Sequence, residues 1–133
     1  MKKTVFFLAL ILLAVFLGSC SISDYERYND FLADLDVYSR MDIAFYEAAK
    51  QNVLFYTKAD LATLEQDLAT LDIGNEDIVY INTRLLDAVG NLCAATEACN
   101  AGNTDEYEEL FKLAENQYAE ARLILSESRT GRP

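Results

Sequence analysis

The chain has 133 residues and a formal net charge of −11 at pH 7, because 22 acidic residues outnumber 11 basic ones. A chain this acidic is repelled by nucleic acid, so we expect no nucleic-acid partner. Histidine is absent, which removes the commonest general base and the usual ligand of zinc, copper and haem. We therefore expect no enzymatic activity, no metal site and no cofactor.

The first twenty residues carry an export signal. Lys2 and Lys3 precede an apolar run from Val5 to Leu17, which is shorter than the ~18 to 20 residues that span a bilayer as a helix. The run ends in Leu17-Gly18-Ser19-Cys20, and these residues resemble the lipobox of bacterial lipoproteins, with Cys20 at the position of the modified cysteine. The alternative is an ordinary secretory leader with a chance cysteine at its end.

The lipoprotein resemblance implies a location and an anchor. It implies that a signal peptide, residues 1–19, is cleaved between Ser19 and Cys20, and that Cys20 carries acyl chains that hold the protein on a membrane of the bacterial cell envelope. Residues 20–23 would form the lipidated N-terminus and a short tether. Residue 21 is serine, not the aspartate that retains many lipoproteins on the inner membrane, so the resemblance implies outer-membrane sorting in a host with two membranes.

The remainder of the chain is predicted to be an all-α domain, residues 24–128. Glycine is absent between Ser23 and Ile73, the only proline is Pro133, and apolar residues recur at spacings of three and four, which is typical of amphipathic helices. We expect an up-and-down bundle of three or four helices, followed by a disordered polar tail, residues 129–133.

The first helix is predicted to begin at a capping box formed by Ser23 and Glu26. A second capping signal, Ser39 with Asp42, predicts a bend or break in this long helix. Aromatic residues are concentrated in this part of the chain. Either they fill the core, or they line a groove that binds a partner segment or an apolar ligand. The possible interaction face comprises Tyr28, Phe31, Tyr38, Phe45 and Tyr56.

The next helix is predicted to be capped by Thr57 with Asp60, and it contains an internal repeat. The sequence from Asp60 to Leu64 recurs from Asp67 to Leu71, and the repeat places four leucines at heptad a and d positions. Such a seam packs either inside the bundle of one chain or between two copies in a homodimer. The leucines are Leu61, Leu64, Leu68 and Leu71.

Two turns delimit the last two helices. Gly74 as a helix-ending glycine and Asn75 as an N-cap predict the first turn, and the segment 100–104 predicts the second, with Asn103 or Thr104 as the cap. The buried face of the third helix is predicted as Ile78, Ile81, Leu85, Ala88, Leu92 and Ala95. That of the last helix, which should end near Ser128, is predicted as Tyr107, Leu110, Phe111, Ala114, Tyr118, Ala121 and Leu125.

Cys93 and Cys99 are a disulfide candidate, because an exported protein reaches a compartment where disulfides form. An intact helix would separate their Cα atoms by about 9 Å along its axis, whereas a disulfide requires roughly 4.4 to 6.8 Å. The bridge therefore requires the third helix to end or unwind before Cys99. We predict the disulfide, with buried free thiols as the alternative.

Three functions are compatible with these observations. The first is a non-catalytic protein-interaction module of the cell envelope, whose acidic surface suits a basic partner. The second is a carrier or sensor that holds a small apolar ligand between its helices. The third is an accessory or immunity-type inhibitor of an envelope enzyme or of phage entry.

Overall fold

The structure, a computed structural model, describes residues 23–129. This part of the chain forms α2 (Asp24–Asp34), α3 (Val37–Ala49), α4 (Phe55–Leu68), α5 (Glu76–Asn100) and α6 (Thr104–Arg129). Residues 23–129 contain no strand, so the all-α prediction is confirmed. The signal peptide, the cleavage site between Ser19 and Cys20, and the lipidated cysteine itself lie outside the described residues. Arg129 still belongs to α6, and the rest of the predicted tail lies outside them too.

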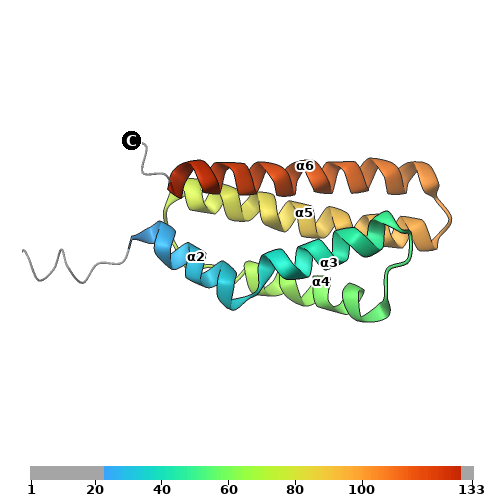
Figure 1. The fold of residues 1–133 in the computed structure, drawn as a ribbon, viewed down its shortest axis with the longest axis horizontal. Helices are drawn as coiled ribbons and strands as arrows, with labels where there is room; N and C mark the ends of the chain where they lie inside the picture. Colours follow the sequence, from blue (N-terminus) through green and yellow to red (C-terminus); the bar gives the residue numbers. More distant parts are fainter. Residues whose placement is uncertain (1–22, 130–133) are drawn as a thin grey trace, which may run out of the picture.

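The helices form an up-and-down bundle (Figure 1). α2 and α3 follow each other in one direction, α4 returns, α5 runs outward again, and α6 returns beside it. The bundle therefore has four arms, of which the first is divided into two helices. We call the end formed by the α3–α4 connection (residues 50–54) and the α5–α6 connection (residues 101–103) the tip. The start of α2 and the end of α6 lie at the opposite end (Figure 1).

The division of the first arm was predicted, but at the wrong residues. The capping box is confirmed, since Ser23 Oγ accepts from the Glu26 N–H and Glu26 Oε2 accepts from the Ser23 N–H, both at 3.2 Å. The break lies at Asp36, which has a left-handed backbone with φ of 50°, a conformation that Asp tolerates better than most residues. Ser39 and Asp42 lie inside α3, so the second predicted cap is wrong.

Two further boundary predictions are corrected. Thr57 does not cap α4, because α4 begins at Phe55 and Thr57 is buried within it. Gly74 does not end a helix, because α4 ends at Leu68 and Gly74 lies in the connection to α5. Asn75 is the predicted N-cap of α5, and its Oδ1 accepts from the N–H groups of Asp77 and Ile78.

The α5–α6 turn at the tip combines a helix-ending motif with a cap. The Asn103 N–H donates to the Ala98 carbonyl at 2.9 Å and the Gly102 N–H to that of Cys99 at 3.1 Å, which is the Schellman arrangement. It requires a left-handed residue, and Gly102 has φ of 75°. Asn103 Oδ1 then accepts from the Glu106 N–H, so Asn103, one of the two predicted caps, begins α6.

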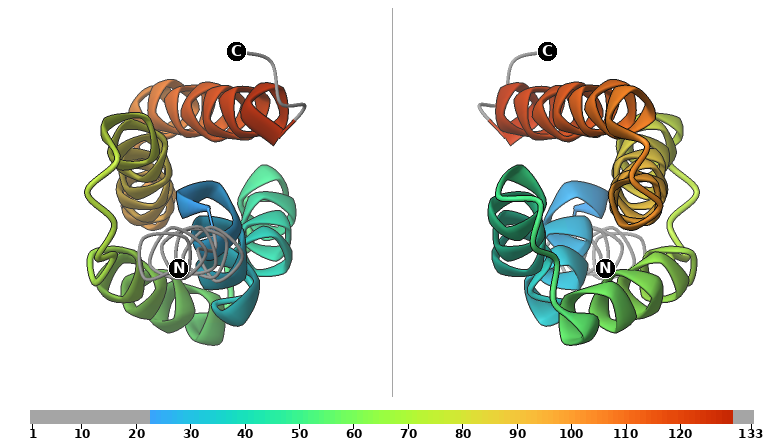
Figure 2. Two further views of the ribbon diagram at one scale, coloured as in Figure 1. Left: turned by 90° about the vertical axis from the view of Figure 1, so that its left-hand side faces the viewer. Right: turned by 90° about the vertical axis from the view of Figure 1, so that its right-hand side faces the viewer.

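The core lies between the four arms (Figure 2). The heptad leucines of α4, Leu61, Leu64 and Leu68, are buried in it, and Leu71, beyond the end of α4, is half-buried against it. Their burial supports the seam inside one bundle, since a homodimer through them would have to open the core. The predicted buried face of α5 is confirmed at all of its positions. On the predicted face of α6, Leu110 and Phe111 are half-buried and the other five positions are buried.

Gly90 offers a test of the α4–α5 packing. It lies inside α5, and a Cβ added there would meet only Glu65 Oε1, at 3.8 Å, which is ordinary van der Waals contact. Because glycine weakens a helix interior, Gly90→Ala should raise the free energy of unfolding by about 0.5 to 1 kcal/mol in urea titrations. The control, Gly102→Ala, should lower it by about 1 kcal/mol because of the positive φ. A loss of stability in Gly90→Ala would show that α4 and α5 pack more closely.

Candidate functional site

The five aromatic residues predicted as an interaction face do not form one. Tyr28 is fully buried, and Phe31, which stacks on it with a centroid distance of 6.2 Å, is half-buried. Tyr38 and Phe45 of α3 pack against Tyr118 of α6 with centroid distances of 6.5 and 5.4 Å. These four rings fill the core, as the first of the two interpretations predicted. Of the predicted set, Tyr56 alone is largely exposed.

The packed rings explain how α6 is held against α3. Besides Tyr118, Phe111 contacts Phe45 edge-on at 5.8 Å, and the Tyr107 hydroxyl donates to the Ala48 carbonyl. The Tyr118 hydroxyl donates to Asp42 Oδ1 at 3.4 Å. Burial, and then the Asp42 carboxylate, raise the pKa of Tyr118 above its ordinary value of 10.0. These tyrosines therefore serve the structure, and the binding surface has to be sought elsewhere.

The cysteine and tyrosine side chains whose pKa is raised by burial predict that the folded protein loses stability at alkaline pH. Burial, and then Glu65 and Glu97, raise the pKa of the Cys93 thiol from 9.0 to about 11, and burial raises that of Tyr28 and Tyr107 as well. Unfolded chains lose these protons at lower pH than the folded protein, so their contribution is complete below pH 9 and is lost as pH rises to about 11 and beyond. Urea midpoints should therefore fall over this range, and less steeply in Cys93→Ala. A flat profile would contradict the burial.

The predicted disulfide does not form. α5 continues without a break through Cys93 and Cys99 to Asn100, and both cysteines are free. The condition for a bridge is therefore not met, because an intact helix keeps their Cα atoms about 9 Å apart along its axis. Cys99 Sγ lies 3.9 Å from the Gln51 carbonyl oxygen at the tip. Cys93 lines a shallow depression between α4 and α5, together with Lys58 and Glu65.

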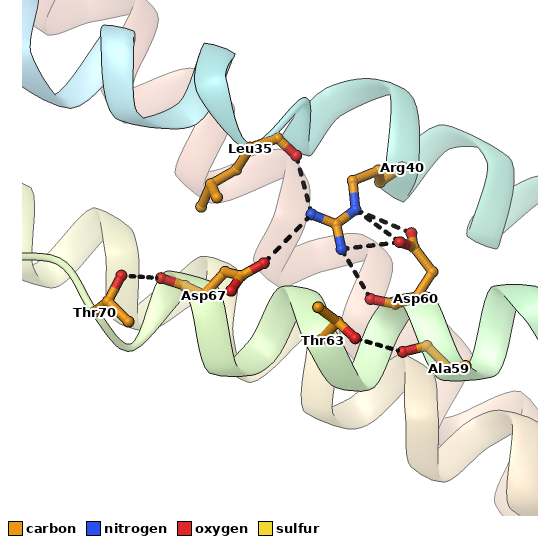
Figure 3. A network of polar contacts seen from close by, with 7 residues as sticks. All are labelled: Leu35, Arg40, Ala59, Asp60, Thr63, Asp67 and Thr70. Atoms are coloured by element: carbon orange, nitrogen blue, oxygen red, sulfur yellow. Dashed lines mark hydrogen bonds and ion pairs between the residues drawn. The ribbon is translucent and has the colours of Figure 1, made fainter.

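A cluster of polar contacts surrounds Arg40 of α3 (Figure 3). Its Nε donates to both carboxylate oxygens of Asp60, at 3.0 and 3.1 Å, and Nη2 donates to the Asp60 carbonyl at 3.1 Å. Nη1 donates to the Leu35 carbonyl at 3.0 Å and lies 3.9 Å from Asp67 Oδ2. The guanidinium is thus occupied by protein groups on several sides. The cluster joins the break between α2 and α3 to α4, and its role is structural.

The candidate site is a group of exposed apolar side chains near the tip. Phe55 and Tyr56 are 79% and 82% exposed, their rings are 6.2 Å apart, and the neighbouring Leu54 is also exposed. α4 buries Thr57, Leu61 and Leu64 instead, so its first two residues turn outward. Ile43 and Tyr46 of α3 are exposed as well. We call Ile43, Tyr46, Leu54, Phe55 and Tyr56 the tip patch.

A shallow pocket of about 160 Å³ adjoins the tip patch, lined by Arg40, Ile43, Tyr56, Thr57 and Asp60. Large apolar side chains gathered at one place on a surface are typical of protein-interaction sites. Our sequence reasoning missed Leu54 and Phe55, although a signal was present. Phe55 and Tyr56 are successive helix positions, which point about 100° apart at 3.6 residues per turn, so they cannot both face one core.

Other kinds of site find no support in residues 23–129. Within this range no three His, Cys, Asp or Glu side chains are grouped so that they could hold a metal ion. No helix among them has the length and apolar character needed to cross a bilayer. Comparison with protein-family models, curated proteins and solved structures found no match.

Proposed function

We propose that this protein is a lipid-anchored, non-catalytic interaction module of a bacterial cell envelope, and that it binds a partner protein through the tip patch. The observation that carries the proposal is the exposure of Phe55 and Tyr56. Exposing two adjacent large rings stabilises no fold, whereas aromatic side chains are enriched in protein interfaces.

The proposed lipid anchor would leave the tip patch accessible to a partner protein. Lipid on Cys20 would place the membrane beside the start of α2, since only two residues, Ser21 and Ile22, separate Cys20 from the cap residue Ser23. The tip lies at the other end of the bundle (Figure 1). α5 has 25 residues, a length of about 37 Å at about 1.5 Å per residue. The tip patch would then face away from the membrane, which in a host with two membranes is the outer one.

Anchoring and binding are tested separately. Full-length protein should be found in the membrane fraction with the added mass of acyl chains, and Cys20→Ala should lose that mass. For binding, chemical crosslinking in intact cells should join the wild-type protein to a partner protein. Phe55→Ser with Tyr56→Ser should lose this adduct at least tenfold, because aromatic residues at the centre of an interface commonly contribute over 1.4 kcal/mol each.

The matched control replaces two exposed apolar residues away from the tip, Val79→Ser with Leu123→Ser, which are 48% and 58% exposed. The control should keep the adduct, and both double variants should unfold within about 0.5 kcal/mol of the wild type, as is usual at exposed positions. If wild-type cells yield no protein adduct, the proposed function is wrong.

The two alternative functions have less support. The depressions near Tyr38, Tyr56 and Cys93 measure about 160, 160 and 240 Å³, below the ~300 to 1,000 Å³ of typical small-molecule sites. None of these three depressions therefore has the size expected of a carrier's or sensor's ligand site. An immunity-type inhibitor would use the same docking surface, and it would be recognised by an envelope enzyme or a phage protein in the crosslinked adduct.

A further inference from the structure

Lys50 places a positive charge at the tip patch. Ile43, Tyr46 and Lys50 are spaced three and four residues apart at the end of α3, so their side chains share one face of the helix. The Lys50 ammonium donates to the Tyr46 hydroxyl and lies 4.0 Å from the centre of its ring. The shallow pocket that Ile43 lines together with Tyr56 joins this face of α3 to the exposed rings of α4.

The Lys50 ammonium has no acidic partner in the part of the chain that the structure describes. Lys50 is exposed, and within residues 23–129 no carboxylate forms an ion pair with it, although Arg27, Arg40 and Arg84 each have one. Its hydrogen bond to a tyrosine hydroxyl leaves the positive charge uncompensated. A carboxylate of a bound partner could therefore pair with it.

Two acidic residues near the patch are engaged elsewhere. The Glu47 carboxylate accepts from the Leu54 N–H at 3.1 Å, where the chain enters α4. Asp60 receives the Arg40 guanidinium on both of its carboxylate oxygens. Each of these carboxylates thus has a donor of its own.

The start of α4 lies in the part of the domain that is poorest in acidic residues. Residues 48–59 contain no Asp or Glu, and this is the longest such stretch between Asp24 and Glu127. Its two charged residues are Lys50 and Lys58, and Lys58 lines the depression between α4 and α5 beside two carboxylates. The first turns of α2, α5 and α6 carry acidic residues, whereas that of α4 carries none. A carboxylate that approaches the start of α4 therefore meets less repulsion than at those three helix starts.

We propose that the tip patch binds a segment of another protein that combines large apolar side chains with Asp or Glu. The apolar side chains would cover Phe55 and Tyr56, and a carboxylate would pair with Lys50. This partner class rests on the proposed function and deepens it. Opposite charges at the border of an apolar contact accelerate and orient docking. The overall charge of the chain favours a basic partner, but salt screens distant charges within about 10 Å, so the charge beside the contact is the one that selects.

A second copy of this chain suits the patch poorly. If two copies met through their tip patches, each would bring a lysine where the other requires a carboxylate. Each copy also carries a net charge of −11, and like net charges oppose association.

The test places a photoreactive phenylalanine derivative at position 55 of the full-length protein, irradiates intact cells and identifies the crosslinked peptides by mass spectrometry. The charge is reversed in Lys50→Glu and removed in Lys50→Met, which keeps an apolar chain beside the Tyr46 ring. The matched control is Lys112→Glu, an exposed position on α6 that changes the net charge equally. Lys112 follows Glu108 by four residues, a spacing that stabilises a helix, so a mere loss of stability would affect the control as well.

We expect the crosslinked peptide to contain Asp or Glu among large apolar residues. Its yield should fall about fivefold in Lys50→Glu and about twofold in Lys50→Met, because reversal replaces an attraction by a repulsion whereas removal only deletes the attraction. The yield should stay unchanged in Lys112→Glu. Changing the acidic residue of the partner to Lys should restore the yield in Lys50→Glu.

Three results would overturn this partner class and leave the proposed function standing: a crosslinked peptide without Asp or Glu, an unchanged yield in Lys50→Glu, or an equal fall in Lys112→Glu. Crosslinking to a second copy would likewise overturn it. Absence of any protein adduct at position 55 would overturn both.

Discussion

Asn82→Ala is expected to lower the free energy of unfolding by about 3 kcal/mol, because it leaves two buried polar groups short of a partner. The Asn82 side chain accepts from the Tyr28 hydroxyl at 3.2 Å, and it donates to the Leu68 carbonyl at 2.9 Å. It thereby joins α2, α5 and the end of α4. Without it, the Leu68 carbonyl keeps only a longer contact, 3.4 Å, with the Leu71 N–H, and a cavity remains where the amide was.

Urea unfolding of a small set of variants measures this. The control is Asn91→Ala on the same helix, whose amide donates to Gln117 at 2.7 Å in a half-buried position. It should cost about 1 kcal/mol or less, because water can replace the lost bond. Tyr28→Phe should cost about 1 to 2 kcal/mol, and combined with Asn82→Ala it should cost less than the sum of both. Equal losses in Asn82→Ala and Asn91→Ala would contradict a buried network.

The apolar periodicity of the sequence correctly predicted those features that depend only on the geometry of a single helix. The buried positions of α5 and α6 follow from the spacing of three and four, because each helix has one side toward the core and that side repeats. Ser23 and Asn75 were also predictable, since a cap bonds to N–H groups two or three residues away. In these cases the sequence neighbours supply the whole interaction.

The two wrong side-chain caps have a common cause, which is competition from distant partners. Asp42 and Asp60 were both interpreted as parts of local caps. In the fold, the Asp42 carboxylate accepts from Tyr118, 76 positions away, and the Asp60 carboxylate binds Arg40 on the preceding helix. The break at Asp36 lies beside the Leu35 carbonyl that Arg40 also holds. Which partner an acidic side chain takes depends on packing that no local pattern records.

The predictions of the interaction face and of the disulfide failed because they depended on where helices begin and end. Tyr28 and Tyr56 were both assigned to the same predicted face, yet one is fully buried and the other is 82% exposed. Whether Tyr56 faces the core depends on where α4 begins, and this was misplaced by the assumed cap at Thr57. The disulfide prediction likewise depended on where α5 ends, because one further turn of helix keeps Cys99 away from Cys93.

Arg40→Met is expected to lower the free energy of unfolding by about 2 to 3 kcal/mol. The side chain of Arg40 is 17% exposed, while those of Asp60 and Asp67 are 45% and 40% exposed. Removing one partner of a fully buried ion pair costs about 3 to 5 kcal/mol, and partial access of water to the two carboxylates reduces that value. The variant would also leave the Leu35 carbonyl without its donor at the α2–α3 break.

Arg40→Lys separates charge from geometry in the same urea experiment. A single ammonium group cannot reproduce the forked contacts to the carboxylate and carbonyl of Asp60 together with the Leu35 carbonyl, so lysine should recover less than half of the loss. Arg27→Met is the control, because Arg27 pairs with Asp24 at 3.6 Å on an exposed surface and should cost under about 0.5 kcal/mol. Full recovery by lysine would mean that charge alone joins α3 to α4. A cost no greater than that of Arg27→Met would mean that apolar packing alone joins them.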